Sequence, residues 1–462
     1  MDDTMAESPG NTGKGMKLHT RILLGLLIGA VLGITANQTL GGSHRAVEWT
    51  NKYVAGPIGQ IFLGMLFMVV IPLVFASISL GVAGLGDLRR VGRVGAKAIG
   101  YFLISTALAA TLGLIVVSFT RPGEQLDPVV REELLRTYAG DAASKVQASH
   151  TSTFGVQTFV NIVTRNPVKS AADLDMLGII FFGMVFGAAL TLITEDRARP
   201  MLGFLQALND VVIKIVELAM RLAPYGVTAL IFGVTSRFGF HLLKPLAWYV
   251  ITVLGTLMLH LFGTISAIVR FLVGLSPRRY FARIRAALIT AFSTSSSNAT
   301  LPTALATAEQ NLGIPPQIAG FVLPLGSTMC MNGTALFEGI TVIFLCQVFG
   351  IQLGLGKMVI VMIMAVLTAV GAAGVPGGSI PLLVGILAMF GVPVEGIAIV
   401  LGVDRILDMT RTMVNVAGDL TATAFVARSE GVWKPADLPE REGLDLAGSD
   451  ESPGGRSREM AG

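Results

Sequence analysis

The chain of 462 residues is 52% apolar and only 14% charged, with a formal net charge of +4. Soluble domains carry about 25% charged residues, so the composition argues against a soluble protein, and several apolar runs have the length of about 20 residues that is needed to cross a lipid bilayer. Basic residues cluster between these runs, which is typical of membrane proteins and does not indicate a nucleic-acid partner. The two cysteines, Cys330 and Cys346, lie in apolar stretches and indicate neither a disulfide framework nor a cysteine-rich metal site.

The N-terminal part of the chain predicts a disordered tail and three ordinary spans. Residues 1–15 are rich in Gly, Ser, Pro and charge, so they cannot bury enough apolar surface to fold alone. The apolar runs at about 18–38, 57–84 and 95–120 are long enough for transmembrane helices, and the basic loop GDLRRVGRVG joins the second to the third. The first run also fits a cleaved signal peptide, but the further spans that follow it at once disfavour that interpretation.

The basic clusters predict the orientation of the chain. By the positive-inside rule they face the cytoplasm, which puts both termini of a multi-pass cell-membrane protein on that side. The clusters are Lys14, Lys17 and Arg21; Arg89, Arg90, Arg93 and Lys97; Arg197 and Arg199; and Arg278, Arg279, Arg283 and Arg285.

The middle of the chain continues the same pattern. A polar stretch from Arg121 to about His150 is expected outside the membrane, and a shorter amphipathic piece lies near 154–165. Three further spans are predicted at about 175–194, 203–234 and 242–274. We interpret residues 16–275 as mainly a scaffold.

Two polar segments at membrane depth break this pattern. STSSSNATLP at 293–302 and GAAGVPGGSIP at 371–381 are each flanked by apolar arms that are too short to span the membrane separately. Non-helical backbone at that depth must be buried in protein or line a cavity, and paired interrupted segments point to the binding site of a transporter. We therefore predict two re-entrant hairpins, each followed by a polar span. The alternative is an extramembrane loop in each place, which the repetition disfavours.

The last predicted span, DRILDMTRTMVNVAGDLTATAFV at 404–426, carries charge on one face. At about 100° per residue, its polar side chains fall in a stripe roughly 100° wide, made of Asp408, Arg411, Thr412, Asn415 and Asp419. Ionisable groups within the membrane usually mark solute or ion pathways. A purely structural alternative, in which Asp408 and Arg411 neutralise each other three residues apart, leaves Asn415 and Asp419 unexplained.

The chemistry of the stripe predicts an acidic solute. Arg411 offers a planar fork of donors that fits a carboxylate, and Asp408, one turn away, suits an ammonium group. Asn415 suits a second carboxylate, and Asp419 supplies the oxygen anion that a small cation such as sodium needs. A second interruption, PLGSTMCMNGTALFEG at 324–339, frees main-chain carbonyls that bind cations, although a plain glycine kink with Ser and Thr bonding back to the chain remains an alternative.

Three motifs, which occur one after another along the chain, resemble those of one family. SSSNATLP, GAAGVPGG and DMTRTMVNVAGD are similar to the first hairpin tip, the second hairpin and the last helix of the dicarboxylate/amino acid:cation symporters, which include archaeal aspartate carriers and animal glutamate carriers. The resemblance covers about residues 17–428. The expected fold is all-α, with eight transmembrane helices, two re-entrant helical hairpins and inverted repeats.

The resemblance also implies how the parts move. It implies a homotrimer that works by an elevator motion, with the second hairpin as the external gate. Residues 276–427 would form the transport core, the span at 95–120 would move with it, and residues 428–462, rich in charge, Gly, Ser and Pro, are expected as a second disordered cytoplasmic tail.

The resemblance assigns roles to individual residues. For the substrate it implies that Arg411 and Thr334 bind the side-chain carboxylate, that Asp408 binds the amino group, and that Asn415, Thr412 and Ser297 bind the main-chain carboxylate, with the Val375 carbonyl near the ammonium. One cation site would use Asp419 with the carbonyls of Gly326, Cys330 and Asn415, and a second would use the carbonyls of Thr328, Ala369, Val370 and Ala372.

Departures from the family pattern predict changed coupling. Where sodium-coupled members read Asn-Met-Asp-Gly-Thr, this chain has Cys330-Met331-Asn332-Gly333-Thr334, and Phe102 replaces a common tyrosine, although Ser105 and Thr106 remain nearby. Without the aspartate, a buried sodium is poorly compensated, so we expect a weak or absent third sodium site.

An arginine of the family is also missing from its usual places. Ser295 stands where some members carry a hairpin arginine. The animal members carry one near Met409 instead, and here the nearest arginine is Arg405, three residues before Asp408. We expect Arg405 to reach the same space.

We therefore hypothesise a sodium-coupled importer of aspartate or glutamate that uses no cofactor besides its coupling ion. Proton coupling, or transport of C4-dicarboxylates, is the first alternative, and an anion channel is less favoured. An enzyme is disfavoured, because nothing places His260, the only histidine in an apolar span, near the serines at 295–297.

Overall fold

The computed structural model describes residues 18–126, 163–173, 176–372 and 374–438. The predicted tail at 1–15, most of the polar stretch at 121–150, most of the amphipathic piece near 154–165 and the end of the second tail from 439 lie outside these residues. The described residues are mainly helical, and no strand occurs among them.

The first half of the chain forms long helices joined by short turns. Its described elements are α1 (Leu18–Leu40), α2 (Arg45–Thr50), the π-helical turn η1 (Asn51–Ala55), α3 (Gly56–Phe67), α4 (Val70–Val91), α5 (Arg93–Thr120), the 3₁₀ turn η2 (Pro122–Gln125), α9 (Pro167–Ala172), α10 (Met176–Leu190), α11 (Glu195–Phe238), η3 (Gly239–Leu242), α12 (Leu243–Leu259), η4 (His260–Ile265), α13 (Ser266–Ile268) and η5 (Val269–Val273).

The second half is more broken. Its described elements are α14 (Pro277–Thr294), α15 (Ser297–Ala306), η6 (Thr307–Asn311), α16 (Pro316–Met329), α17 (Asn332–Val348), α18 (Leu355–Val370), α19 (Ile380–Met389), η7 (Val394–Ile397), α20 (Ala398–Leu401), α21 (Asp404–Ser429) and η8 (Pro435–Asp437).

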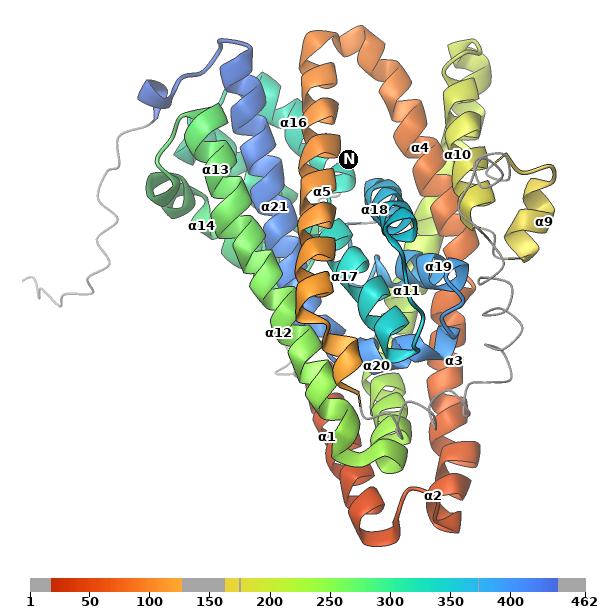
Figure 1. Ribbon diagram of the computed structural model, residues 1–462. Coiled ribbons are helices and arrows are strands. Elements are labelled where there is room, and N and C mark those ends of the chain that lie inside the picture. Colours follow the sequence, from red (N-terminus) through yellow and green to blue (C-terminus); the bar gives the residue numbers. More distant parts are fainter. Residues whose placement is uncertain (1–17, 127–162, 174–175, 373, 439–462) are drawn as a thin grey trace, which may run out of the picture.

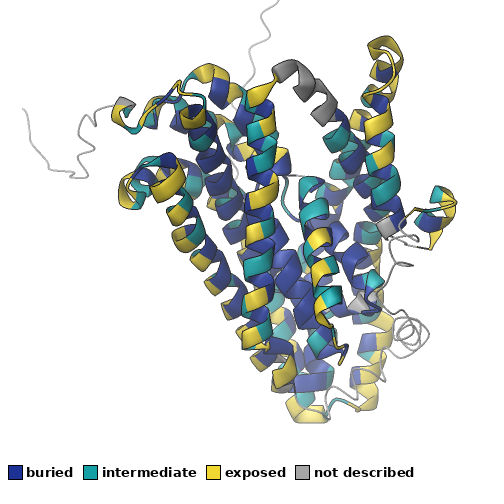
Figure 2. Ribbon diagram, turned by 45° about the horizontal axis from the view of Figure 1, so that its top comes forward, coloured by how far each residue is buried: buried dark blue, intermediate teal, exposed yellow. Residues whose placement is uncertain are grey.

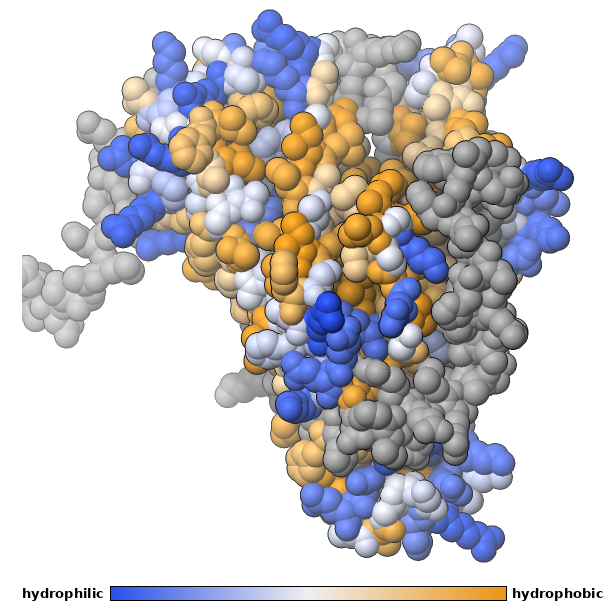
Figure 3. Space-filling view, in the orientation of Figure 1, coloured by the Kyte–Doolittle hydropathy of each residue, from blue (hydrophilic) through white to orange (hydrophobic). Residues whose placement is uncertain are grey.

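The helices have the length and composition of membrane spans. Within the described residues, six helical segments are long and apolar enough to cross a bilayer: Thr20–Leu40, Arg45–Ala83, Arg93–Gln125, Glu195–Phe238, Lys244–Val273 and Pro316–Val348. Figure 3 shows an apolar area over the upper middle of one face, a hydrophilic patch just below it, and further hydrophilic residues toward the two ends. In Figure 1 the α4–α5 and α10–α11 turns lie at the top and the α1–α2 turn lies at the bottom, so the basic clusters at 89–97 and 197–199 share one end of the bundle.

The scaffold helices meet through small residues. Helix α1 packs along α11, and α11 also contacts α3 and α4. A side-chain carbon at Gly25 or Gly29 would come within 2.5 Å of a main-chain carbonyl oxygen of α11, that of Pro224 or Thr228. Glycines at this four-residue spacing let two helices approach closely in a membrane, which places α1 firmly against α11.

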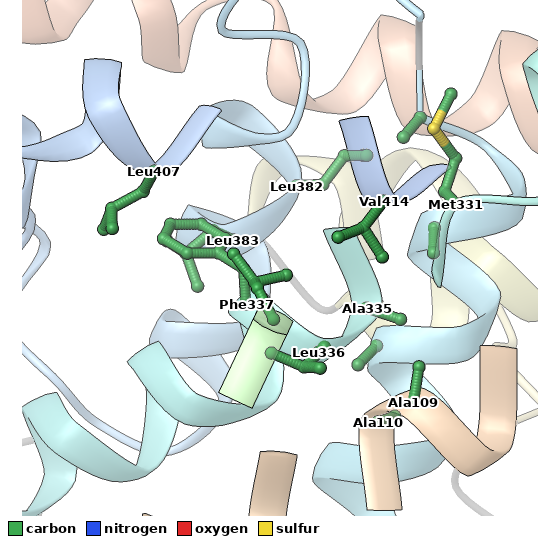
Figure 4. Close-up of a cluster of buried hydrophobic side chains, with 14 of the residues drawn as sticks. Ala109, Ala110, Met331, Ala335, Leu336, Phe337, Leu382, Leu383, Leu407 and Val414 are labelled. Carbon is green, nitrogen blue, oxygen red and sulfur yellow. The ribbon is translucent and has the colours of Figure 1, made fainter. Parts of the chain in front are cut away.

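The rest of the chain surrounds a deeply buried helix, α17. It packs against α5, α18 and α21, and all of its residues except Gln347 are buried, as the dark blue interior of Figure 2 illustrates. Figure 4 shows how apolar side chains of three neighbouring helices converge on those of α17. They are Ala109 and Ala110 of α5, Leu382 and Leu383 of α19, and Leu407 and Val414 of α21, which meet Ala335, Leu336 and Phe337 of α17.

Each predicted hairpin corresponds to two helices in contact, and the predicted interruption is present. Helices α14 and α15 contact each other and are joined by Ser295 and Ser296, where Ser295 has a left-handed φ of 53°. Helices α18 and α19 likewise contact each other on either side of the glycine-rich segment 371–379. Between α16 and α17 the helix breaks at Cys330 and Met331, whose ψ angles of 71° and 56° are not helical.

One boundary of the sequence prediction is wrong. The sequence predicts residues 428–438 to be part of a disordered tail, but α21 continues to Ser429 and Trp433 is only 1% exposed. The Trp433 indole Nε1 donates to the main-chain oxygen of Leu312 at 2.8 Å. This contact joins residues far apart in sequence, so local composition does not reveal it.

Candidate functional site

The predicted polar stripe of α21 lies inside the protein. Asp408, Arg411, Thr412, Asn415 and Asp419 are all buried, with exposed fractions between 1% and 7%. Their helix packs against α14, α16 and α17, so lipid does not contact this face. The stripe therefore meets other parts of the protein, as the cost of exposing charge to lipid requires.

A small cavity joins the stripe to both hairpins. Its volume is about 20 Å³. Six of the seven residues predicted to bind substrate line it, namely Asp408, Thr412, Asn415, Thr334, Ser297 and Val375, together with Ser295, Met331, Ala372, Gly374 and Ser379. Four separate segments of the sequence thus converge on one point.

The hairpin tips touch each other at this cavity. The main-chain oxygen of Gly374, in the second tip, accepts from the Ser296 hydroxyl at 2.6 Å and from the main-chain N–H of Asn298 at 3.2 Å. The second tip is also tied to α21, because the Gly377 amide donates to Asp408 Oδ2 at 3.1 Å. Two of these hydrogen bonds join the tips to each other, and the third joins the second tip to α21.

Arg411 is the one predicted substrate residue that does not line the cavity. Its Nη1 donates to Asp404 Oδ1 at 2.9 Å and its Nη2 donates to Asp408 Oδ1 at 2.8 Å. The guanidinium carbon also lies 3.9 Å from the centre of the Phe337 ring, a cation–π arrangement. The ion pair between Asp408 and Arg411, which the structural alternative requires, does form, and Asp404 is a second partner of the guanidinium.

The geometry describes a closed site. Pockets for small ligands usually measure about 300–1,000 Å³, so a cavity of about 20 Å³ has no room for a dicarboxylate. Two carboxylates compensate the buried guanidinium, as a charge in this position requires. A dicarboxylate therefore does not fit the site in the arrangement that this structure shows.

Asn415 and Thr334 form a second link across the cavity. Asn415 Oδ1 accepts from the Gly333 amide at 2.7 Å, and its Nδ2 lies 3.2 Å from the Thr334 hydroxyl. The Thr412 hydroxyl donates to the Asp408 main-chain oxygen at 2.9 Å. The interrupted helix is therefore held to α21 at the position where both are predicted to bind substrate.

The first predicted cation site brings a carboxylate against main-chain groups. Asp419 Oδ1 is buried and has no hydrogen-bond partner in the described residues. A side-chain carbon at Gly326 would come within 2.8 Å of that oxygen, so the backbone of Gly326 lies beside it, and the helix that contains Gly326 ends at Cys330. An unpaired carboxylate oxygen next to a helix end fits a small cation.

The residues of the second predicted cation site lie on α16 and α18, two helices that contact each other, and in the second tip. Ala369 and Val370 end α18, and Ala372 follows in the second tip, where its amide donates to the Ala369 oxygen at 3.2 Å. Thr328 lies near the end of α16, a helix that contacts α18, but its side chain is exposed and bonds to its own helix. Within the described ranges, no hydrogen bond joins the Thr328 side chain to the other three residues.

A neutral amide, that of Asn332, stands where the resemblance implies a third cation site. Asn332 Oδ1 accepts from Thr106 Oγ1 at 2.9 Å and from Ser105 Oγ at 3.2 Å, and Cys330 Sγ lies 3.7 Å away. Asn332 Nδ2 is buried and has no partner in the part of the chain that the structure describes. The oxygen that could face a cation is thus already occupied by protein donors.

Sequence reasoning missed Glu338 and Asp404. Glu338 on α17 is 0% exposed, its Oε2 accepts from Thr368 Oγ1 at 2.7 Å, and its Oε1 has no partner among the described residues. It was detectable as a lone carboxyl group in an apolar run. Asp404 lies seven residues before Arg411, two helical turns away, so extending the stripe by one turn would have included it.

Arg405, the arginine that the sequence analysis considers as a substitute, lies in the first turn of α21 and is not among the residues that line the cavity. It is 7% exposed, and its Nη1 is 3.5 Å from Asp408 Oδ2. It therefore reaches the carboxylate that faces the cavity.

This arrangement defines a class of protein: a multi-pass helical membrane protein whose closed polar site lies between two hairpin tips and an interrupted helix. The chain belongs to the sodium:dicarboxylate symporter family, which matches residues 18–429. The family is one of transporters, so membership also gives the class of function.

Relatives in this family are similar over almost their whole length. The chain is 36% identical to a proton/sodium-glutamate symport protein of Bacillus caldotenax, covering 88% of this chain and 94% of the relative. It is 34% identical to a proton/glutamate-aspartate symporter of Escherichia coli (strain K12), covering 91% and 95%, and 34% identical to a C4-dicarboxylate transport protein of Bacillus subtilis (strain 168), covering 91% and 96%.

Proposed function

We propose that this protein is a secondary active symporter that imports an acidic amino acid, aspartate or glutamate, with sodium as the coupling ion. The observation that carries the proposal is the cavity itself, where both hairpins, the interrupted helix and α21 meet around Asp408, Asn415 and Thr334. The names of the relatives agree with an acidic solute.

In this proposal the closed site opens by movement of the second hairpin. Separation breaks the bonds from Gly374 and Gly377 and exposes Asp408. The side-chain carboxylate of the solute then replaces a carboxylate on Arg411 and meets Thr334, and its ammonium meets Asp408 and the Val375 carbonyl. Thr412, Asn415 and Ser297 hold the main-chain carboxylate.

Asp419 is the proposed anchor of the coupling sodium. Its unpaired Oδ1 supports a first cation site with the carbonyls of Gly326, Cys330 and Asn415, and the carbonyls of Thr328, Ala369, Val370 and Ala372 remain the proposed second site. The hydrogen bonds to Asn332 support a degraded third site, because a neutral amide does not offset the desolvation of a buried cation.

The proposal includes the assembly and the moving parts. Residues 276–427 form the transport core of each subunit of a homotrimer in the cell membrane, with both termini in the cytoplasm. An ion pair joins the start of α5 to the end of α21, since Arg93 Nη2 lies 2.8 Å from Glu430 Oε2. This contact supports movement of α5 with that core.

Proton coupling is the second candidate, and Glu338 favours it. A carboxyl group buried in an apolar helix with only one hydrogen-bonded oxygen is a natural proton carrier, since ionised groups at that depth are expensive. Both cations appear in the names of the relatives. The same solute site serves either coupling ion.

Uptake of radiolabelled aspartate into proteoliposomes tests both candidates. A sodium gradient alone, at equal pH on both sides, is compared with a proton gradient alone in the absence of sodium. Uphill uptake driven by sodium supports the proposal. Uphill uptake driven only by protons supports the second candidate, in which Glu338 binds the coupling ion. Uptake that never exceeds equilibrium under either gradient supports an anion channel, and no uptake at all contradicts the assignment.

A further inference from the structure

Arg405 is a buried arginine whose hydrogen-bonding capacity is largely unused. It sits in the first turn of α21 and is 7% exposed. Its Nε and Nη1 atoms are buried and have no hydrogen-bond partner in the described residues. A guanidinium without compensation is expensive to bury, so a negative charge is needed nearby.

That charge is the carboxylate of Asp408. Arg405 Nη1 lies 3.5 Å from Asp408 Oδ2, whereas Arg411 donates to the other oxygen, Oδ1, at 2.8 Å. On a helical wheel at about 100° per residue, Arg411 is displaced about 60° to one side of Asp408 and Arg405 about 60° to the other. Asp408 is therefore compensated from both sides.

The charges of this cluster balance without a solute. Asp404 and Asp408 carry two negative charges, and Arg405 and Arg411 carry two positive charges, all four residues being at most 7% exposed. Asp408 Oδ2 also accepts from the Gly377 amide, which is neutral. If Arg405 were absent, a single positive charge would face two buried carboxylates, and a solute ammonium would be needed to restore the balance.

We propose that Arg405 determines which acidic solutes the site accepts: by compensating Asp408 Oδ2, it takes the place of a solute ammonium and admits dicarboxylates that lack an amino group. This inference rests on the proposed function and changes its substrate class. The protein takes succinate as well as aspartate, because Asp408 is not left unpaired when no ammonium arrives. Arg405 acts through Asp408 and is a specificity-determining residue.

Matched solutes isolate the contribution of the ammonium. Succinate and glutarate correspond to aspartate and glutamate without the amino group. The ratio of uptake within each pair therefore measures how much the amino group contributes to recognition of the solute. The measurement uses the full chain in proteoliposomes under the gradient that drives aspartate uptake, at a pH where all carboxyl groups of the solutes are ionised. The wild type is expected to take both members of a pair with apparent affinities within about tenfold, since neither leaves a buried group unpaired.

Three variants of Arg405 and its partner test the mechanism. In Arg405→Met the affinity for succinate relative to aspartate falls by about tenfold or more, because a buried charge left unpaired is penalised. Arg405→Lys keeps the charge and retains the wild-type ratio. The double variant Arg405→Met with Asp408→Asn removes both charges and regains succinate uptake, a rescue that a merely structural role for Arg405 does not produce.

The matched control is Arg428→Met, at the far end of the same helix. Arg428 is exposed and donates to the Leu272 main-chain oxygen, so its loss leaves the ratio unchanged. The inference is overturned if wild-type protein takes aspartate but rejects succinate, or if Arg405→Met lowers both uptakes equally. If Arg405→Met does not fold, the wild-type ratio and the double variant still decide. Failure of the wild type to take any of the four solutes overturns the proposed function instead.

Discussion

The scaffold pair α1 and α11 and the core around α21 hold their helices together by different means. Between α1 and α11 the contact is made by Gly25 and Gly29 against main-chain oxygens, and helix α1 has no acidic residue. Around α21 two arginines and two aspartates of that same helix compensate one another, and hydrogen bonds from the main-chain N–H of Gly377 to Asp408 and of Gly333 to Asn415 join the helix to other segments. The first interface depends on close approach, and the second depends on hydrogen bonds to a helix whose charges are compensated within it.

This difference indicates which contacts persist during transport and which contacts are exchanged. A glycine contact has one good geometry, since moving either helix loses van der Waals contact at every position. A cluster of charges has alternative partners of similar chemistry, because a solute carboxylate can replace Asp404 or Asp408 on Arg411. We infer that the α1–α11 pair is rigid in the transport cycle, and that the core around α21 exchanges its partners.

The largest expected effect comes from Arg411→Lys. The substitution keeps the charge but removes the planar fork that holds two carboxylates. Loss of one hydrogen bond between charged groups costs about 1.5–3 kcal/mol, so uptake at limiting aspartate should fall by about 10- to 100-fold. Arg428→Lys is the control in the same helix. If Arg411→Lys keeps more than about a tenth of wild-type uptake, exchange of carboxylates on a bidentate guanidinium is not the mechanism.

The next effect concerns Asp419→Asn, which removes the charge next to Gly326 without changing the size of the side chain. A unit charge at about 4 Å is worth about 4 kcal/mol at an effective dielectric of 20. We expect the sodium concentration for half-maximal uptake to rise by at least about tenfold, which needs only a third of that energy. Glu338→Gln should leave this concentration unchanged. If Asp419→Asn leaves it unchanged as well, sodium binds elsewhere or does not drive uptake.

The sequence predicted the arrangement of the core well because its signals are local. The last span is predicted at 404–426 and observed as Asp404–Ser429, since a charged stripe within an apolar helix is visible in the sequence. The hairpin tips at Ser295 and at 371–379 follow from the same reasoning, because serine and glycine clusters at membrane depth are tolerated only where protein or a cavity shields the backbone from lipid.

The partners of the charged side chains could not be predicted. A helical wheel gives the face on which Arg411 lies, but not whether its donors point to Asp404, to Asp408 or into a cavity. That choice depends on the closed position of the second hairpin, which holds Asp408 through Gly377. Trp433 illustrates the same limit, because its acceptor, Leu312, lies 121 residues earlier in the chain.

A smaller effect, on stability alone, is expected in the scaffold for Gly29→Ala. The added carbon would come within 2.5 Å of the Thr228 carbonyl oxygen, and overpacking of this kind costs about 1–3 kcal/mol. The apparent unfolding temperature in detergent should fall, while uptake per folded molecule stays near the wild-type value. Gly203→Ala on α11 is the control, since nothing lies within 4 Å of its added carbon. Equal unfolding temperatures for the two variants would mean that close approach of α1 and α11 does not stabilise the scaffold.

The smallest effect is expected at the end of the core, where Glu430 links α21 to α5. Hydrogen bonds from Arg93 and then from Lys97 hold the pKa of the Glu430 carboxyl below its ordinary value. A carboxyl whose pKa is lowered by folding stabilises the protein above its unfolded pKa, and the stabilisation is lost as the pH falls through the folded value. Glu430→Gln should therefore lower the unfolding temperature slightly at pH 7 and make no difference at a pH below the folded pKa. Because the pair lies at the surface, high salt should also reduce the difference. A difference that persists in acid would assign the effect to packing, and the link between α5 and the core would then depend on the contact of α5 with α17.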